Sequence, residues 1–383
     1  MRAIPRRALG AAFLFLWGAA LHGQGKRVGN ILLEAPAPAP VQEITGAFPQ
    51  IVGTQVGSSG YKFSKEPLVI EGAKAVAELG SRIIKTRQPA APELAQLIGM
   101  PFTHYLFWHR AGDVWKDGFT KEESAREYAA TYAFAKDLLT RRDTSGKIFF
   151  LGHWQGDAQL LEGLDPSADV PKAQADAMVE WLNVRQKAVD DARREVPYSR
   201  CQVYVYAEVS RVREAMKQGR KRMADQVLPR VDVDFVSYAA YDCQLLPAPE
   251  VLATLEHLSR QLKPKPSLPV RRVFIGECGL PLSACVDAAD HERRNREIIA
   301  KFLGWKPPLV LHWQLYDAEK KDGKYAGWSL IGPDRKPTPL HAVLRALLAA
   351  QEEASKQYQA RARRLPGVEE MAGFTEDWLR RPR

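Results

Sequence analysis

Eight short apolar segments alternate with amphipathic stretches along most of this chain, and this alternation constrains its fold more than any other feature. The apolar segments predict strands at Ile51–Gly57, Ser81–Arg87, His104–Arg110, Lys147–Trp154, Gln202–Glu208, Asp234–Tyr241, Arg272–Cys278 and Leu309–Tyr316. Between and after them, apolar residues recur at spacings of three and four, which predicts helices at Leu68–Leu79, Pro92–Ile98, Lys121–Thr140, Lys172–Arg193, Arg211–Ala224, Pro249–Leu262, Asp287–Leu303 and Pro339–Gln351. Eight strands, each followed by a helix, over about 300 residues are typical of an α/β protein built as a single (β/α)8 TIM barrel.

A doubly wound open sheet is the competing architecture, and it normally carries a glycine-rich phosphate-binding turn after its first strand. The chain has glycines there, at Gly53, Gly57 and Gly60, but they do not have the GxGxxG spacing of such a turn. We therefore expect a barrel over residues 47–350 and no cofactor.

The N-terminal 25 residues have the pattern of a secretory signal peptide. Arg2, Arg6 and Arg7 precede an uncharged apolar run from Ala8 to Leu21, which is shorter than the roughly 20 residues that a stable membrane anchor needs. We expect cleavage between residues 20 and 25, a periplasmic or extracellular protein, and no membrane association after cleavage. A retained single anchor is the alternative.

Two further segments differ from the barrel pattern. Residues 26–46 contain Ala35–Pro40, an alternating Ala-Pro stretch that favours extended geometry, so this region is predicted to be a linker. Residues 351–383 are rich in charge and show no strand pattern, which predicts a charged C-terminal tail or terminal helix at the surface.

The chain carries a formal net charge of +10, but the excess is dispersed, with local clusters at residues 211–222 and at the C-terminus. A solvated basic face, or mild attraction to acidic polymers, explains this better than nucleic-acid binding, which we do not expect. No feature of the sequence specifies an oligomeric state.

Four cysteines are present in a chain predicted to be exported, where disulfides can form. Cys243, Cys278 and Cys285 all follow or end predicted strands, so one disulfide among them could brace that end of the barrel. Cys201 precedes the fifth strand at the opposite end and is predicted to be a buried thiol.

Polar and aromatic residues collect where the predicted strands end. The clusters are Phe107–Arg110, Gly152–Asp157, Tyr204–Glu208, Ser237–Asp242, Gly276–Gly279 and His312–Asp317. In a β/α barrel the carboxyl ends of the strands carry the active site. These segments are therefore the expected site.

Sugar recognition suits these residue types, because aromatic rings lie against the apolar face of a pyranose while polar side chains bind its hydroxyls. The expected substrate-binding residues are His109, His153, Trp154, Tyr206, Tyr238, His312, Trp313 and Gln314. For any one of the tryptophans, core packing is the alternative.

Glu277 is the strongest candidate for a catalytic residue. It follows the hydrophobic run from Val273 to Gly276 and precedes Cys278 and Gly279, which places a carboxylate at a strand end between glycines. A structural carboxylate paired with an arginine is the alternative.

The segment Gly276-Glu-Cys-Gly279, the Trp313 of the last strand and the polar end of the fourth strand resemble clan A glycoside hydrolases, which are retaining enzymes on a β/α barrel. The resemblance implies a glutamate nucleophile at the end of strand seven, which Glu277 matches. It also implies an acid/base glutamate at the end of strand four, where this chain has Gln155.

An amide cannot protonate a leaving oxygen, and loss of general acid catalysis costs about 10²–10⁴-fold in rate. Three hypotheses follow: Glu208 carries the proton, Asp157 carries it, or the protein binds sugar without cleaving it. The sequence thus predicts a retaining glycoside hydrolase acting on a poly- or oligosaccharide, with a non-catalytic carbohydrate-binding barrel as the alternative.

A metal-dependent hydrolase is a third and less favoured hypothesis. His109, His153 and His312 end three predicted strands and could join Asp157 or Asp317 at a metal. However, metal-dependent amidohydrolase barrels usually carry His-x-His on their first strand, which here offers Thr54 and Gln55. We therefore expect no catalytic metal.

Overall fold

The computed structural model describes residues 49–381, except residues 110–114, 163–164, 166 and 269–270. The predicted signal peptide, the predicted linker and the first two residues of the predicted barrel therefore lie outside the described residues.

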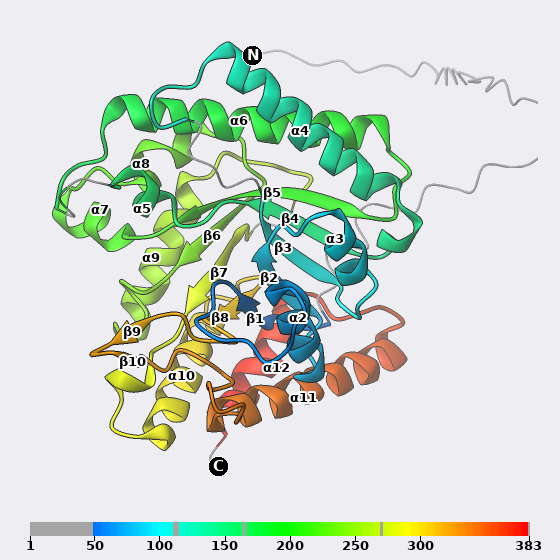
Figure 1. The fold of residues 1–383 in the computed structure, drawn as a ribbon, viewed down its shortest axis with the longest axis vertical. Coiled ribbons are helices and arrows are strands. Elements are labelled where there is room, and N and C mark those ends of the chain that lie inside the picture. Colours follow the sequence, from blue (N-terminus) through cyan, green and yellow to red (C-terminus); the bar gives the residue numbers. More distant parts are fainter. Residues whose placement is uncertain (1–48, 110–114, 163–164, 166, 269–270, 382–383) are drawn as a thin grey trace, which may run out of the picture. The chain divides into compact units, whose positions relative to one another are not determined.

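Eight parallel strands form a closed barrel in the order β1 to β8, so the predicted (β/α)8 fold is confirmed (Figure 1). The strands are β1 Val52–Val56, β2 Ile83–Arg87, β3 His104–Trp108, β4 Ile148–Gly152, β5 Gln202–Val209, β6 Phe235–Ala239, β7 Val273–Cys278 and β8 Val310–His312. Strand β8 pairs with β1, which closes the ring. A short hairpin of β9 (Lys320–Lys321) and β10 (Lys324–Tyr325) follows β8.

Helices follow the strands and cover the outside of the barrel (Figure 1). They are α2 Leu68–Glu78, α3 Ala91–Ile98, α4 Lys121–Thr140, α5 Gly156–Leu160, α6 Lys172–Glu195, α7 Val212–Gln218, α8 Met223–Gln226, α9 Ala248–Gln261, α10 Ala288–Leu303, α11 Pro339–Ala362 and α12 Val368–Arg380. The single helix predicted at Arg211–Ala224 is wrong. Gly219 has a left-handed backbone (φ 64°) that ends α7, and the chain restarts as α8.

The inside of the barrel is filled by aromatic rings. Phe150 of β4 packs against Tyr204, Phe235 and Phe274 of the next strands at ring centroid distances of 5.6, 5.2 and 6.0 Å. All four rings are buried, and they form a floor beneath the carboxyl ends of the strands.

The C-terminal segment packs on the barrel helices. Residues 351–362 continue α11, and α12 buries Met371, Ala372 and Leu379, while its contacts are with α10 and α11. The segment expected as a charged tail thus contributes an apolar helix face to the core, because its charges lie on the opposite face.

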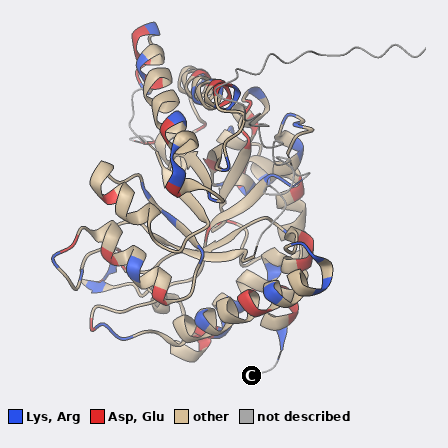
Figure 2. Ribbon diagram, turned by 90° about the vertical axis from the view of Figure 1, so that its right-hand side faces the viewer, with Lys and Arg blue, Asp and Glu red and all other residues tan. Residues whose placement is uncertain are grey.

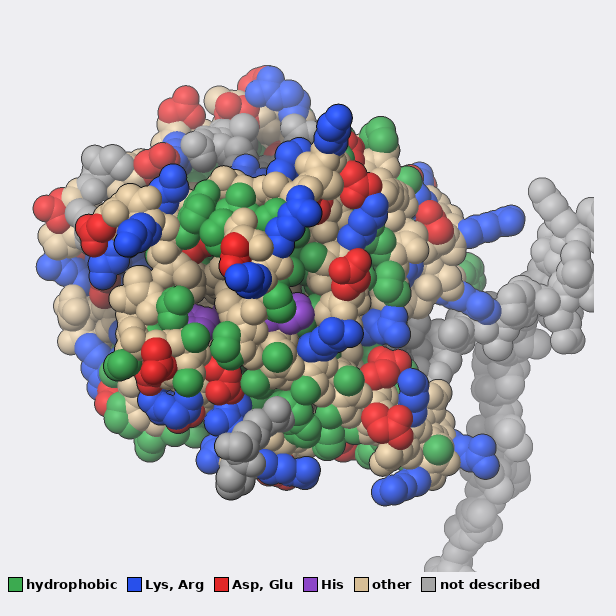
Figure 3. Space-filling view, turned by 60° about the horizontal axis from the view of Figure 1, so that its bottom comes forward, with side chains coloured by type: hydrophobic (Ala, Val, Ile, Leu, Met, Phe, Trp, Pro, Cys, Tyr) green, Lys and Arg blue, Asp and Glu red, His purple; other side chains and the backbone are tan. Residues whose placement is uncertain are grey.

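Charged residues lie mainly on the helices, with both signs interspersed, and the face drawn in Figure 3 also carries both signs (Figures 2 and 3). Within the part of the chain that the structure describes, no helix combines the length and the apolar character that crossing a membrane requires.

Asp234 links the start of β6 to β5, α6 and the segment before β7. Its buried carboxylate makes the stability of the fold depend on pH. Its carboxylate is buried and accepts hydrogen bonds from the Val205 backbone and from Arg193 and Lys265. Burial opposes ionisation, but the two cations outweigh it and lower the pKa of Asp234 from 3.8 to about 2.

Because the folded pKa is depressed, this stabilisation is present above pH 4 and is lost as the pH falls towards 2. We predict that the free energy of unfolding of the wild type decreases over that range by about 2 kcal/mol more than that of Asp234→Asn. Urea denaturation at several pH values measures this, and equal slopes would contradict it.

Candidate active site

Four polar side chains from different strands meet inside the carboxyl end of the barrel. They are Lys85 of β2, Gln155 just after β4, Glu208 of β5 and Glu277 of β7. Segments α5, α7 and the β9–β10 hairpin, which follow β4, β5 and β8, lie on the same side (Figure 1). The structure thus brings three of the predicted catalytic residues together.

A β-bulge turns Glu277 into the barrel. Strict alternation along β7 would place Phe274 and Gly276 inside and Glu277 outside. Tyr238 of β6 pairs with Ile275 of β7, but the next residue of β6, Ala239, pairs with Glu277. Strand β7 therefore contains one extra residue, Gly276, at this point. The extra residue reverses the alternation and directs the carboxylate inward. Glycine is required at position 276, since a Cβ atom there would overlap the Ser237 hydroxyl.

Gln155 contacts both glutamates. Its side-chain amide donates a hydrogen bond of 2.8 Å to Glu277 Oε2, and its backbone N–H donates one of 3.0 Å to Glu208 Oε1. Its backbone has a positive φ of 20°, uncommon for a residue with a side chain, and it caps the start of α5. This turn places the amide against the carboxylate of Glu277.

Glu208 is fully engaged within the barrel. Its Oε2 accepts hydrogen bonds from the Lys85 ammonium and from Ser237 Oγ (2.6 Å), and its Oε1 accepts the Gln155 N–H. Its side chain is 0% exposed. This geometry suits a carboxylate that orders the site rather than one that delivers a proton to a bound saccharide.

Lys85 is the cation of the cluster. Its Nζ lies 3.6 Å from Glu277 Oε1, donates to the Gly276 carbonyl at 3.1 Å, and lies 4.9 Å from the centroid of the Trp108 ring. The pKa of Glu277 is raised from 4.5 to about 7, chiefly by burial and also by the charge of Glu208, although Lys85, Gln155 and Tyr241 act in the opposite direction. The carboxyl of Glu277 therefore ionises near neutral pH.

Aromatic side chains surround this cluster. Trp313 lies 6.4 Å from Trp108 between ring centroids and donates its indole N–H to Glu319 at 3.1 Å. Tyr241, whose hydroxyl lies 3.4 Å from Glu277 Oε2, packs edge-on against Trp328. Trp154 is 41% exposed, the most exposed of these rings that the structure describes.

A pocket of about 420 Å³ opens next to the cluster. Its lining comes from the segments after β4, β5 and β6, namely Gln155, Ala158, Leu161, Ser210, Arg211, Ala239, Tyr241 and Asp242. Gln155 and Tyr241 join this pocket to Glu277, because both also contact its carboxylate. A space of this size accommodates a sugar ring.

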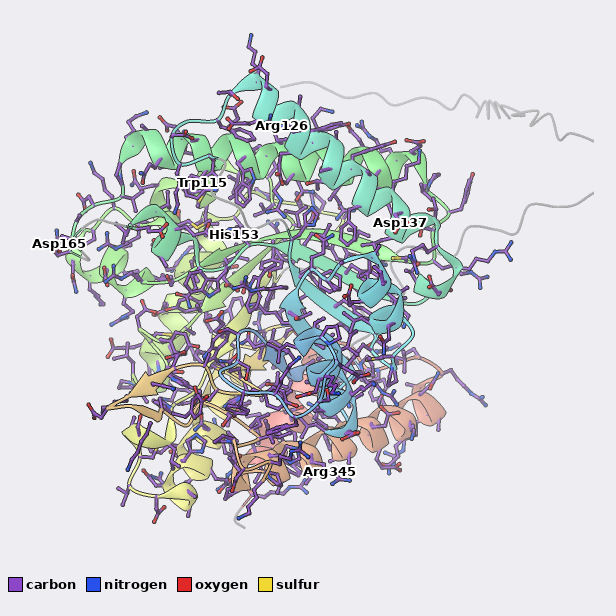
Figure 4. All side chains as sticks on the ribbon, in the orientation of Figure 1. Trp115, Arg126, Asp137, His153, Asp165 and Arg345 are labelled. Atoms are coloured by element: carbon purple, nitrogen blue, oxygen red, sulfur yellow. The ribbon has the colours of Figure 1, made fainter. Side chains whose placement is uncertain are left out.

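Three of the predicted residues lie outside the barrel interior. Asp157 is buried and accepts hydrogen bonds from the backbone of Ser210 and Met223, so it does not reach Glu277. His109 stacks on Phe134 of α4. His153 lies under Trp181 of α6 and accepts the Glu208 N–H at 3.2 Å, and burial lowers its pKa to about 4 (Figure 4).

Four further predicted contacts are buried as well. His312 faces Asn295 and Gly279 on the outer side of β8 and is 0% exposed. Tyr206 lies inside the barrel below the site, Gln314 is 0% exposed, and the Tyr238 hydroxyl donates to Asp242 at 2.6 Å. Of the eight predicted substrate contacts, Trp154 and Trp313 retain exposed surface.

The cysteines do not form the predicted disulfide. Cys243, Cys278 and Cys285 are all free thiols, so the expectation of a bridge among them is wrong. Cys278 follows the bulge and faces out of the barrel with His312, its register partner on β8, which separates it from the loop that carries Cys285. Cys201 is a buried thiol, as predicted.

Lys85 is a site residue that the sequence analysis did not select, whereas Ser237 and Tyr241 lie in the segment Ser237–Asp242 that it placed at the site without assigning them a role. Lys85 had a usable signal, since a lysine inside the apolar run Ile83-Ile84-Lys85 is rarely buried without a charged partner. Within the described residues, no group of three or more His, Cys, Asp or Glu side chains is arranged to hold a metal ion, and His109, His153 and His312 lie apart.

Structural comparison finds glycoside hydrolases with the same barrel. They include a GH2 β-galacturonidase from Eisenbergiella tayi (12% identity, TM-score 0.48, 78% of this chain and 51% of that chain covered) and a β-glucuronidase from an uncultured Clostridium species (10%, 0.49, 78% and 50%). Xylanase 10B from Thermotoga maritima matches at 12% identity and a TM-score of 0.46, with 82% of this chain and 98% of that chain covered.

The present chain spans about half the length of the galacturonidase and glucuronidase chains. No family model and no curated protein sequence matches it. The assignment of the barrel rests on the strand pairing itself.

The raised pKa of Glu277 makes a prediction about stability. In the unfolded chain this carboxyl ionises near 4.5, whereas in the fold it ionises near 7, so its ionisation weakens the fold as the pH rises between these values. We compare the unfolding free energy of Glu277→Gln with that of the wild type at each pH. Between pH 4.5 and pH 8, we predict that this difference shifts by about 1–3 kcal/mol in favour of the variant. Thermal denaturation at both pH values measures this, and a pH-independent difference would contradict it.

Proposed function

We propose that this protein binds a saccharide at the carboxyl end of the barrel and cleaves a glycosidic bond by a retaining mechanism, with Glu277 as the nucleophile. The observation that carries the proposal is the contact of 2.8 Å between Gln155 and Glu277, which joins the ends of β4 and β7 beside an open pocket. The glycoside hydrolases among the structural neighbours are consistent with it. We further propose that the protein acts outside the cytoplasm after removal of residues 1–25.

The electrostatics around Glu277 suit a nucleophile. Lys85 stabilises its anionic form, and Gln155 and Tyr241 donate hydrogen bonds to it. The oxygen Oε1 makes no hydrogen bond to any described residue. A carboxylate with one such oxygen can attack an anomeric carbon while its other oxygen is held in place.

Among the described residues, the site has no clear proton donor. In retaining hydrolysis a second carboxyl group about 5–5.5 Å from the nucleophile protonates the leaving oxygen. The residue after β4, where the resemblance implies the acid, is Gln155, an amide whose side-chain nitrogen lies 2.8 Å from Glu277 Oε2. Glu208 is held by Lys85, Ser237 and the Gln155 N–H, and Asp157 lies elsewhere. We therefore propose that turnover depends on good leaving groups, which need little acid assistance.

A non-catalytic carbohydrate-binding barrel is the second candidate function, and the Gln155 amide favours it. With no acid at this position, a glycoside bound in the pocket that Gln155 and Tyr241 line would leave uncleaved. This function requires sugar binding that survives replacement of Glu277 and is lost on replacement of the exposed aromatic rings.

Aryl-glycoside cleavage distinguishes the two functions. We predict that the wild type cleaves 2,4-dinitrophenyl glycosides slowly and that Glu277→Gln lowers the rate by about 10²-fold or more. Gln155→Glu restores a general acid, so we expect about 10²–10⁴-fold faster cleavage of substrates with poor leaving groups. A panel of aryl glycosides with graded leaving groups provides the measurement.

Gln357→Glu, the same change on the exposed side of α11, is the matched control and should have no effect. Cleavage that persists in Glu277→Gln would refute the nucleophile. Binding of a glycan in the absence of any cleavage by the wild type or by Gln155→Glu would favour the binding function instead.

A further inference from the structure

Glu319 is an exposed carboxylate beside the site, and the catalytic scheme does not use it. It follows Trp313 by six residues, and its Oε1 accepts the indole N–H of Trp313 at 3.1 Å. Trp313 packs against Trp108, and the Trp108 ring lies 4.9 Å from Lys85 Nζ. Two tryptophans therefore connect Glu319 to the buried cation of the site.

The buried carboxylate of Asp317 fixes the backbone around Glu319. Its Oδ1 accepts the Glu319 N–H at 2.9 Å, and its Oδ2 accepts the N–H groups of Gly327 and Trp328 at 2.6 and 3.0 Å. The Ala326 N–H donates to the Glu319 carbonyl at 2.9 Å. The base of the β9–β10 hairpin is therefore closed. A side chain carried on such a fixed backbone loses little freedom when it binds a ligand.

The segment after β1 supports the same loop. The Asp317 N–H donates to the Tyr61 hydroxyl at 3.0 Å, and the Gly60 N–H donates to the Asp317 carbonyl at 2.9 Å. Tyr325 of the hairpin donates its hydroxyl to the Gly60 carbonyl at 2.8 Å. The hairpin and the segment after β1 thus hold each other in place.

The second oxygen of Glu319 remains available. Within the described part of the chain, Oε2 makes no hydrogen bond or ion pair, and the Nζ of the adjacent Lys320 lies over the Tyr325 ring, 5.2 Å from its centroid. Burial raises the pKa of Tyr241, and the charges of Glu277 and, to a smaller extent, of Glu319 raise it further. Both carboxylates therefore lie within electrostatic range of Tyr241.

The two oxygens of Glu277 face different groups. Oε2 accepts hydrogen bonds from Gln155 and Tyr241, and both of these residues line the pocket. Oε1, which has no hydrogen bond to a described residue, lies 3.6 Å from Lys85 Nζ on β2. The oxygen that is available for attack is therefore the one directed towards Lys85.

The strand order places Trp313 and Glu319 on the side of Lys85. The pocket is lined by the segments after β4, β5 and β6. In the closed ring, β1 and β2 lie between β8, which Trp313 follows, and β3, which Trp108 ends. A sugar attacked by Oε1 would thus lie on the side of Trp313 and Glu319, and the pocket would remain for the leaving group.

We propose that Glu319 binds the sugar whose anomeric carbon Glu277 attacks. Oε1 holds the Trp313 indole as a platform for the apolar face of that sugar, and Oε2 accepts a hydrogen bond from one of its hydroxyls. The inference rests on the proposed function and assigns the pocket to the leaving group. A hydrogen bond to an ionised acceptor is about twice as strong as a neutral one, so this contact selects for a hydroxyl at one position of the sugar.

Deoxy sugars test the inference. The probes are the 2,4-dinitrophenyl hexoside that the wild type cleaves fastest and its 3-, 4- and 6-deoxy forms. Position 2 stays intact, because hydrogen bonds to its hydroxyl strengthen in the transition state. We expect removal of one hydroxyl to raise the KM of the wild type about tenfold, with little change in kcat.

Glu319→Gln keeps an acceptor for the indole but removes the charge, so its KM for the parent glycoside should rise about tenfold, with kcat near that of the wild type. The deoxy sugar that the wild type disfavours should bring little further loss in this variant, because both changes remove the same contact. Glu180→Gln, on the exposed side of α6, is the matched control and should behave as the wild type. Circular dichroism of each variant confirms that it is folded.

An unchanged KM in Glu319→Gln would overturn the inference. Losses from the three deoxy sugars that are the same in Glu319→Gln and in the wild type would also overturn it, because they would not depend on Glu319. In both cases cleavage that depends on Glu277 would still support the proposed function. Where the wild type binds the glycosides without cleaving them, their Kd values replace KM in the same comparison. Absence of both cleavage and binding in the wild type would instead refute the proposed function.

Discussion

One buried cation between two buried carboxylates is the interaction on which the rest of this site depends. Lys85 contacts Glu208 and lies 3.6 Å from Glu277 Oε1, and none of the three side chains is more than 1% exposed. Removing Lys85 would leave both buried carboxylates without a cation in a medium of low polarizability, which costs about 3–5 kcal/mol. Lys85 thus offsets the charge of the carboxylates that are buried in this end of the barrel.

The two glutamates differ in how their oxygens are hydrogen-bonded. Glu208 has hydrogen-bond partners on both oxygens, so it fixes Lys85, Ser237 and the turn at Gln155. Glu277 has its partners on one oxygen, and the other faces Lys85 without a hydrogen bond. The same strand ends therefore provide one residue that orders the site and one that remains available for chemistry. The β-bulge in β7 creates this difference, because it changes which residue of the strand faces inward.

The sequence predicted the barrel well because eight strand and helix periods are long-range patterns that tolerate errors of a few residues. It also predicted that Gln155, Glu208 and Glu277 converge, since all three follow or end parallel strands. It did not predict which polar residues face inward. His109, His153 and His312 stand beside aromatic residues in the sequence, yet their side chains point to the surrounding helices. A bulge of one residue reverses the facing of a strand, and hydrophobic alternation gives no sign of it at a position flanked by glycine.

Glutamine and glutamate have nearly the same volume, so either residue fits at position 155 beside Glu277. The amide replaces a repulsive pair of carboxylates by a hydrogen bond and requires no repacking of the turn at α5. Exchange between the two residues is therefore a single step that needs no change of side-chain volume; if the proposed function holds, the amide form favours stability and the acid form favours catalysis. On that proposal, a catalytic acid at position 155 could be exchanged for the amide, and regained, without rebuilding any other part of the site.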